Sequence, residues 1–181
     1  LRLDLIDNDT IKEVAGGASQ SLGGAGLGNG TFLTGEVYTV DKNFPVVSSI
    51  TRLITSPNAG ASVTFRVTFS QLVTGVDTTD FILNTTGVTG AGITSVTGTG
   101  TTRTVTVNTG SDSGTIRLDL VDNNTILSSS TGLVLGGLAL GDGDFTTGQV
   151  YTIDKVPPTV LSIVRASPYS TAAATVTYTV T

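Results

Sequence analysis

The chain contains no cysteine, histidine, tryptophan or methionine among its 181 residues. Without cysteine and histidine it can form no thiol nucleophile, no serine–histidine pair and no zinc site of the common ligand types. Disulfides are excluded too, so packing must stabilise the fold. These absences remove most routes to catalysis, and we expect that the protein is not an enzyme.

Charged and aromatic residues are scarce, at 13% and 6% of the chain. Nine basic and fourteen acidic side chains give a formal net charge of −5, which does not fit a nucleic-acid partner. Paired carboxylates could hydrolyse glycosides, but the acidic residues lie in predicted turns and aromatic sugar platforms are few. Four tyrosines are present, and Tyr178 is expected in the core. No apolar run approaches the 18 residues that a membrane-spanning helix needs.

Threonine, valine and glycine are abundant instead, and apolar residues alternate with polar ones along much of the chain. Threonine and valine are stiff at χ1 and pack well on a pleated surface. No segment keeps an apolar period of 3.6 residues. The alternating valine, isoleucine, leucine and phenylalanine supply the apolar surface that disordered chains lack. The sequence therefore predicts an all-β fold.

Internal repetition organises the chain. Residues 2–11 recur as residues 117–126, an offset of 115, and residues 35–42 recur as residues 148–155, an offset of 113. Self-similarity at a fixed period indicates a repeat architecture. The repeat is therefore about 113 residues long, with small insertions or deletions between the matched blocks.

The phase of this repeat divides the chain into three parts. Residues 1–44 form the C-terminal part of one repeat, residues 45–157 form a complete repeat, and residues 158–181 form the N-terminal part of the next. Both ends fall inside strand-like segments, where domain boundaries are not expected. We therefore expect a slice through a tandem array. Its incomplete ends would be completed by further repeats of the same chain or by strands of a neighbouring subunit.

Seven short strands are expected in the complete repeat, which is typical of an immunoglobulin-like (Ig-like) β-sandwich. They cover residues 46–54, 63–69, 81–83, 93–97, 103–107, 115–120 and 150–153. Alternation places one set of side chains in the core: Phe65, Val67, Phe69, Val105, Val107, Ile116, Leu118 and Leu120. It places another set outside: Thr64, Arg66, Thr104, Thr106, Arg117 and Asp119.

Several short motifs carry a resemblance to a known class. They are Val-Thr-Phe-Ser at 67–70, Val-Thr-Gly-Val-Asp at 73–77, Arg-Leu-Asp-Leu at 117–120, Val-Tyr-Thr-Ile-Asp at 150–154 and Pro-Pro-Thr-Val at 157–160. With these motifs the chain resembles the bacterial Ig-like repeats of large, repetitive, secreted surface proteins. The resemblance covers nearly the whole chain and implies tandem Ig-like sandwiches. Proteins of this class act as adhesin stalks, matrix components or surface-layer parts.

We therefore expect an extracellular or cell-surface structural protein, whose repeats form a filament, fibre or stalk. Its partners would be adjacent repeats of the same chain or neighbouring copies. Two alternatives stay open: the shaft of a cell-surface adhesin, and a carbohydrate-binding module of a secreted enzyme. The linkers at residues 41–45 and 154–158 are short and contain proline, which discourages bending between repeats.

Alternating strand direction predicts that several acidic loops and the linker before residue 46 meet at one end of the sandwich. The residues concerned are Asp41, Asp77, Asp80, Asp122 and Asn124, and Asp142 and Asp144 are close enough in the sequence to join them. Clustered hard oxygen ligands with few basic neighbours suit calcium. A calcium ion there would stiffen the joint between two repeats. The alternative is that each side chain caps a turn or faces water.

The segment from residue 122 to residue 147 is an unusually long loop for a compact domain. It is rich in glycine, but no Lys-Ser/Thr motif follows, so it does not fit a phosphate-binding loop. Its leucines and valines leave two alternatives open. The loop is either a surface excursion with a hairpin of its own, or a contact between repeats or subunits.

Overall fold

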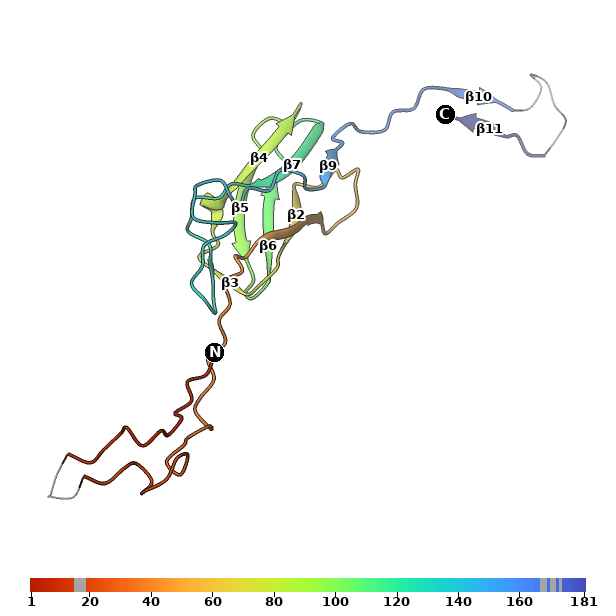
Figure 1. Ribbon diagram of the computed structural model, residues 1–181. Helices are drawn as coiled ribbons and strands as arrows, with labels where there is room; N and C mark the ends of the chain where they lie inside the picture. Colours follow the sequence, from red (N-terminus) through yellow and green to blue (C-terminus); the bar gives the residue numbers. More distant parts are fainter. Residues whose placement is uncertain (15–18, 167–168, 170–171, 173) are drawn as a thin grey trace. The chain divides into compact units, whose positions relative to one another are not determined.

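The structure is a computed structural model that describes residues 1–14, 19–166, 169, 172 and 174–181. The chain forms two compact units, Leu1–Asn43 and Phe44–Thr181, and each is described by itself (Figure 1). Among the described residues no helix is long and apolar enough to cross a membrane.

The unit Phe44–Thr181 contains a four-stranded antiparallel sheet in the order β1-β2-β6-β5. Its strands are β1 (Val47–Arg52), β2 (Ser62–Phe69), β5 (Gly92–Thr97) and β6 (Thr102–Asn108). The two long central strands pair without a register shift, whereas both outer pairs have one. In this strand order β1 and β5 are the edge strands.

A second antiparallel sheet has the order β4-β7-β9. It consists of β4 (Phe81–Thr86), β7 (Gly114–Leu120) and β9 (Val150–Ile153). Both sheets contribute side chains to one hydrophobic core, and the two ribbons lie against each other (Figure 1). The architecture is all-β and consistent with a β-sandwich, as the sequence predicts.

Shorter elements complete this unit. β3 (Val73–Thr74) pairs with β8 (Leu127–Ser128), a 3-10 turn η1 (Thr78–Asp80) precedes β4, and β10 (Ile163–Arg165) pairs with β11 (Tyr178–Val180). The seven predicted strands of the complete repeat are all present. β3 and β8 were not predicted, because two residues are too few to show a period.

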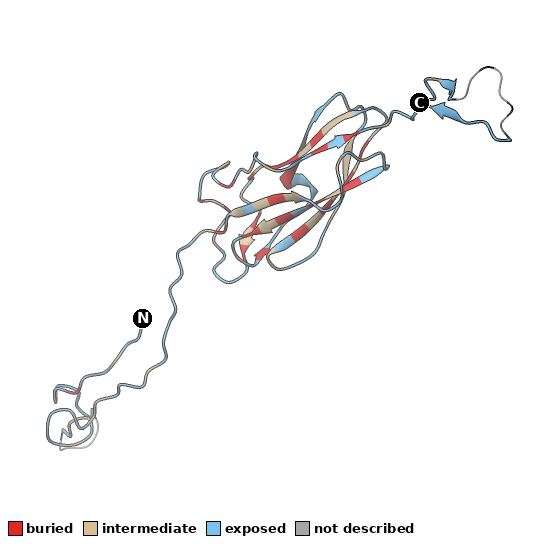
Figure 2. Ribbon diagram, turned by 90° about the vertical axis from the view of Figure 1, so that its right-hand side faces the viewer, coloured by how far each residue is buried: buried red, intermediate tan, exposed pale blue. Residues whose placement is uncertain are grey.

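The core follows the alternation of β2, β6 and β7 (Figure 2). The predicted core is confirmed, because all eight side chains are at most 2% exposed. The rings of Phe65 and Tyr151 meet edge to face, with their centroids 5.0 Å apart, and join the two sheets at the centre. Tyr151 is itself fully buried, so it cannot serve as a sugar platform.

One predicted surface residue is buried. Asp119 is only 7% exposed, so its predicted exposure is wrong. Arg117 lies two residues away on the same face of β7 and forms a bidentate ion pair with it, with N–O distances of 2.7 and 2.8 Å. The guanidinium covers the carboxylate and satisfies both of its oxygens, which makes the burial of Asp119 tolerable.

The unit Leu1–Asn43 has three antiparallel bridges and no named strand among its described residues. The bridges join Arg2 to Val37, Leu5 to Phe32, and Lys12 to Ser21. At the repeat offsets of 115 and 113, the same pairings occur in the other unit: Arg117 with Val150, Leu120 with Phe145, and Leu127 with Val134. The residues that match in sequence thus form the same antiparallel pairings in both units.

The hairpin of β10 and β11 repeats the first hairpin in the same way. Its pairs Ile163–Val180, Val164–Thr179 and Arg165–Tyr178 match Ile50–Val67, Thr51–Arg66 and Arg52–Phe65 at an offset of 113. Tyr178 is 58% exposed, however, so the expectation that it is a core residue is wrong. Its counterpart Phe65 is buried by the second sheet, and β10 and β11 form a sheet of two strands only.

Phe65→Ala tests the core. We expect the free energy of unfolding to fall by about 3–5 kcal/mol, because the change removes a fully buried ring and leaves a cavity. Arg66→Ala, at the neighbouring exposed position, should change it by less than about 0.5 kcal/mol. Denaturant melts of the two variants measure both effects, and a loss below about 1 kcal/mol for Phe65→Ala would contradict the assigned face.

Candidate functional site

The acidic end of the sheets, formed by Asp77, Asp80, Asp122, Asn124 and Asp144, begins at the turn η1. Asp77 caps this turn, since its Oδ1 accepts hydrogen bonds from Thr79 N and Thr79 Oγ1 at 2.7 and 2.6 Å. Asp80 reaches back in turn, and its Oδ2 accepts from Asp77 N at 2.7 Å. This reciprocal arrangement is a capping box, with aspartate in place of the usual glutamate or glutamine.

Asp80 is also the link between η1 and the loop that follows β7. Its side chain is fully buried, and its Oδ1 accepts a hydrogen bond from Thr125 Oγ1 at 2.9 Å. Its backbone oxygen accepts from Val121 N at 2.9 Å. The sequence analysis did not single out Thr125. The Asp-Asn-Asn-Thr run at 122–125, which favours turns closed by side chains, is the signal that could have found it.

Asp122 holds the long loop closed. It is 3% exposed, and its two carboxylate oxygens accept hydrogen bonds from Asn124 N at 3.0 Å and from Gly143 N at 3.2 Å. Its own backbone N–H donates to Asp144 Oδ1 at 2.7 Å. Asn124 has φ at 64°, in the left-handed region that asparagine tolerates. Asp122 is therefore a structural staple between the two ends of the loop.

The predicted meeting of acidic residues is found in part. Asp77, Asp80, Asp122 and Asp144 are connected through Thr125 and the backbone of residues 121–122. Asp142 instead accepts from Ala139 N within its own turn. Asp41 belongs to the other unit, where its Oδ1 accepts from Asn43 N and Nδ2.

The carboxylates of the acidic end mostly accept hydrogen bonds from the chain itself. No group of three acidic side chains among the described residues is placed to hold a metal ion. The amide Oδ1 of Asn124, and the Oδ1 of its counterpart Asp9 in the other unit, are buried without a hydrogen-bond partner. Calcium binding at Asp41, Asp77, Asp80, Asp122 and Asn124 stays a prediction.

The long loop packs into the core instead of lying wholly on the surface. Ile126 and Leu135 are fully buried, and Leu135 N donates to Ile126 O at 2.9 Å. Leu138 and Leu140, at the far part of the loop, are 79% and 74% exposed. Gly136 has φ at 71°, and a Cβ there would lie 2.2 Å from Gly143 N. Glycine is therefore required where the two sides of the loop cross.

The first unit contains the same loop. Asp7 is 3% exposed and accepts hydrogen bonds from Asp9 N and Gly30 N, as Asp122 does from Asn124 N and Gly143 N. Gly23 has φ at 72°, and its Cβ would lie 2.5 Å from Gly30 N. Asp7 and Asp122 therefore close their loops with the same pair of hydrogen bonds.

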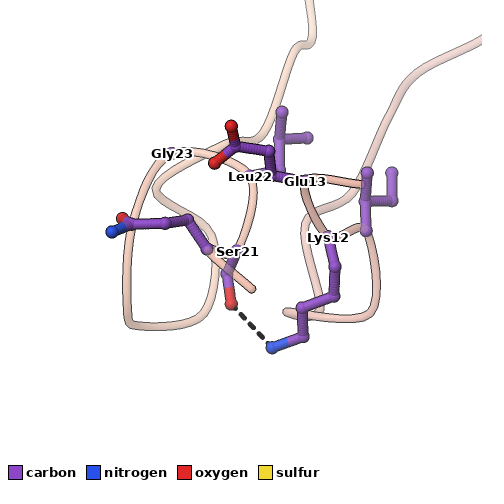
Figure 3. A pocket seen from close by; sticks show the side chains of 7 residues that line it. Lys12, Glu13, Ser21, Leu22 and Gly23 are labelled. Carbon is purple, nitrogen blue, oxygen red and sulfur yellow. Dashed lines mark hydrogen bonds between the residues drawn. The ribbon is translucent and has the colours of Figure 1, made fainter. Parts of the chain in front are cut away.

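A hollow of about 360 Å³ lies in this first loop (Figure 3). Ile11, Leu22 and the stem of Lys12 line it, and Lys12 Nζ donates to Ser21 Oγ at 2.9 Å. The counterparts of Ile11 and Leu22 are Ile126 and Leu135, which are buried in the core of the complete unit. The counterpart of residues 12–13 is β8, which pairs there with β3. The hollow therefore marks a place that a strand occupies in the complete unit.

Comparison of the chain with protein-family models, with curated proteins and with solved structures finds no match.

The pKa values of Asp80, in η1, and of Asp77, which caps it, are shifted in opposite directions. Burial raises the pKa of Asp80 above its ordinary value of 3.8, whereas hydrogen bonds from Thr79 lower the pKa of Asp77. The folded state then binds a proton at Asp80 more readily than the unfolded state does. The contribution of Asp80 to the free energy of unfolding therefore falls as pH rises from 3.8 through its folded-state pKa.

An NMR titration of the side-chain carboxyls measures this order directly. We expect Asp80 to lose its proton at a higher pH than Asp77. The same midpoint for both groups, or the reverse order, would contradict the burial of Asp80 beneath Thr125.

The calcium prediction is tested on the full chain. If calcium binds at the acidic end, it should raise the melting temperature of the folded protein, since a ligand that binds only the native state stabilises it. Asp77→Asn with Asp122→Asn should remove the increase. Equal melting temperatures in calcium and in chelator would show that these carboxylates only cap turns.

Proposed function

We propose that the chain is a stretch of a tandem array of Ig-like β-sandwiches, and that the array is an extracellular structural filament or stalk. The observation that carries this proposal is the shared register of its parts. Residues 1–43 pair as β7, the long loop and β9 do, and the hairpin β10–β11 pairs as β1 and β2 do. In the proposed array they belong to the sandwiches on either side of the complete one.

Exposed apolar side chains support the same reading. Leu1 and Leu3 are 83% and 88% exposed, whereas their counterparts Ile116 and Leu118 are fully buried. An extended segment that exposes alternate leucines in this way needs a second layer to cover them. Because this segment carries the same alternation as β7, it fits strands like those of the four-stranded sheet.

The chemistry of the chain favours a structural role over binding a small molecule. The acidic side chains mostly close turns, and Tyr151 is committed to the core. These observations count against a carbohydrate-binding module. The shaft of an adhesin would be built in the same way and would differ only in the domain that it carries.

A segment exchange tests the array. In the full chain, residues 116–157 are replaced by a second copy of residues 1–44, which begins at the counterpart of Ile116. We expect the variant to keep a cooperative unfolding transition, because cores tolerate extensive apolar substitution when pattern and volume are kept.

The matched control carries Leu3→Asn and Leu5→Asn in the inserted copy only, and it should lose the transition. Loss of cooperativity in the exchange variant itself, with the natural chain still cooperative, would overturn the assignment of residues 1–44 to a sandwich.

A further inference from the structure

The end of β1 and the residues that follow it are joined to β9, although β1 and β9 belong to different sheets. We call this contact the terminal seam and define it as residues 50–58 with residues 149–154. β1 is an edge strand of the four-stranded sheet, and β9 is an edge strand of the three-stranded sheet. The seam therefore closes one side of the sandwich.

Residue numbers increase in the same direction along the two segments of the seam. Hydrogen bonds run from Gln149 N to Ile50 O at 3.0 Å, from Thr152 N to Ser56 Oγ at 2.8 Å and from Asp154 N to Asn58 O at 3.0 Å. Asn58 and Ile153 form a parallel bridge. The two segments are therefore parallel, so the chain enters the seam at one end and leaves it at the other.

Tyr151 is the centre of the seam. Its hydroxyl accepts hydrogen bonds from Leu53 N and Ile54 N, both at 3.0 Å, and donates to Thr64 O at 2.7 Å. One donor and two acceptor positions are all that a hydroxyl has, and each is used. Next to it, Arg52 donates from Nη1 to Val150 O at 3.0 Å, and its guanidinium lies 5.8 Å from the Tyr151 ring centroid.

Lys155 holds the chain to the neighbouring loops at the point where it leaves the seam. Its Nζ donates to Ala59 O, Gly60 O and Thr109 Oγ1, at 3.1, 2.8 and 2.9 Å. Its backbone N–H donates to Ser113 Oγ at 2.8 Å. Two loops, the one between β1 and β2 and the one between β6 and β7, are thus held to Lys155, which lies two residues after the end of β9. The seam cannot fray from this end without breaking several of these hydrogen bonds.

From this geometry we propose that the sandwich is a load-bearing unit, and that the terminal seam sets the force at which it unfolds. The inference rests on the proposed array, in which tension enters before β1 and leaves after Lys155. Pulling parallel segments from opposite ends slides them past each other, so their hydrogen bonds are loaded together. Pulling from the same end would load them one after another.

The repeat carries the elements of this seam to both neighbouring sandwiches. Tyr38 and Lys42 stand at the counterparts of Tyr151 and Lys155, and Ile163 and Arg165 stand at the counterparts of Ile50 and Arg52. Every sandwich of such an array would then resist tension in the same way, which a stalk under load requires.

Single-molecule stretching of the full chain tests the proposal. Because the chain contains no cysteine, two introduced cysteines define where force is applied. Lys42→Cys with Val156→Cys loads the seam from opposite ends, and Ala59→Cys with Val156→Cys loads it from one end, since Ala59 is an exposed residue directly after the seam segment 50–58. We expect an unfolding force at least about twofold higher for the first pair, because bonds that share a load must fail together.

Variants assign the force to the seam. Tyr151→Phe keeps the ring against Phe65 and removes the hydroxyl, so it should lower the force for the first pair and leave the second nearly unchanged. The matched change Tyr178→Phe, in β11, should alter neither. Equal forces for the two pairs, or an equal fall in both on Tyr151→Phe, would overturn the proposal.

The two experiments separate the two proposals. If the two cysteine pairs give equal unfolding forces while the segment-exchange variant unfolds cooperatively, only the load-bearing seam is rejected. If the forces differ while the segment-exchange variant loses its cooperative transition, only the array is rejected.

Discussion

The edge-to-face contact between Phe65 and Tyr151 holds the two sheets together. It joins a central strand of one sheet to an edge strand of the other within the hydrophobic core. The same tyrosine carries its hydroxyl to the seam and satisfies two backbone N–H groups beyond the end of β1. One side chain therefore supplies apolar area to the core and helps to close one edge of each sheet. Open strand edges can recruit other chains, so this closure removes two such edges from the surface.

The long loop after β7 is held together by hydrogen bonds between its two ends. A loop of this length leaves many backbone groups without partners unless its ends are tied together. Asp122 does this with two backbone N–H groups, and the glycine at position 136 allows the two sides to cross closely. Asp7 and Gly23 make the same closure in the other unit. The acidic residues that suggest a metal site from sequence thus have a structural use, and the loop supplies Ile126 and Leu135 to the core.

Most of the β-architecture could be predicted from the sequence, because period-two alternation in β2, β6 and β7 leaves one choice of buried face. Four features could not. Asp119 is buried because Arg117 lies over it, and alternation alone does not report a pair on one face. β3 and β8 are too short to show a pattern. The arrangement of acidic residues depends on which backbone N–H groups each carboxylate meets, and strand direction predicts only the end of the sheet where they lie. Tyr178 stays exposed because β10 and β11 form a sheet of two strands only.

The register shared by residues 1–43, the complete sandwich and the β10–β11 hairpin is what an array of equal domains would produce. Electron microscopy of the native polypeptide tests for such an array. We expect a row of globules of one size, joined by short linkers at a constant spacing. Particles in which a sandwich of this kind occurs once, beside domains of other sizes, would contradict it.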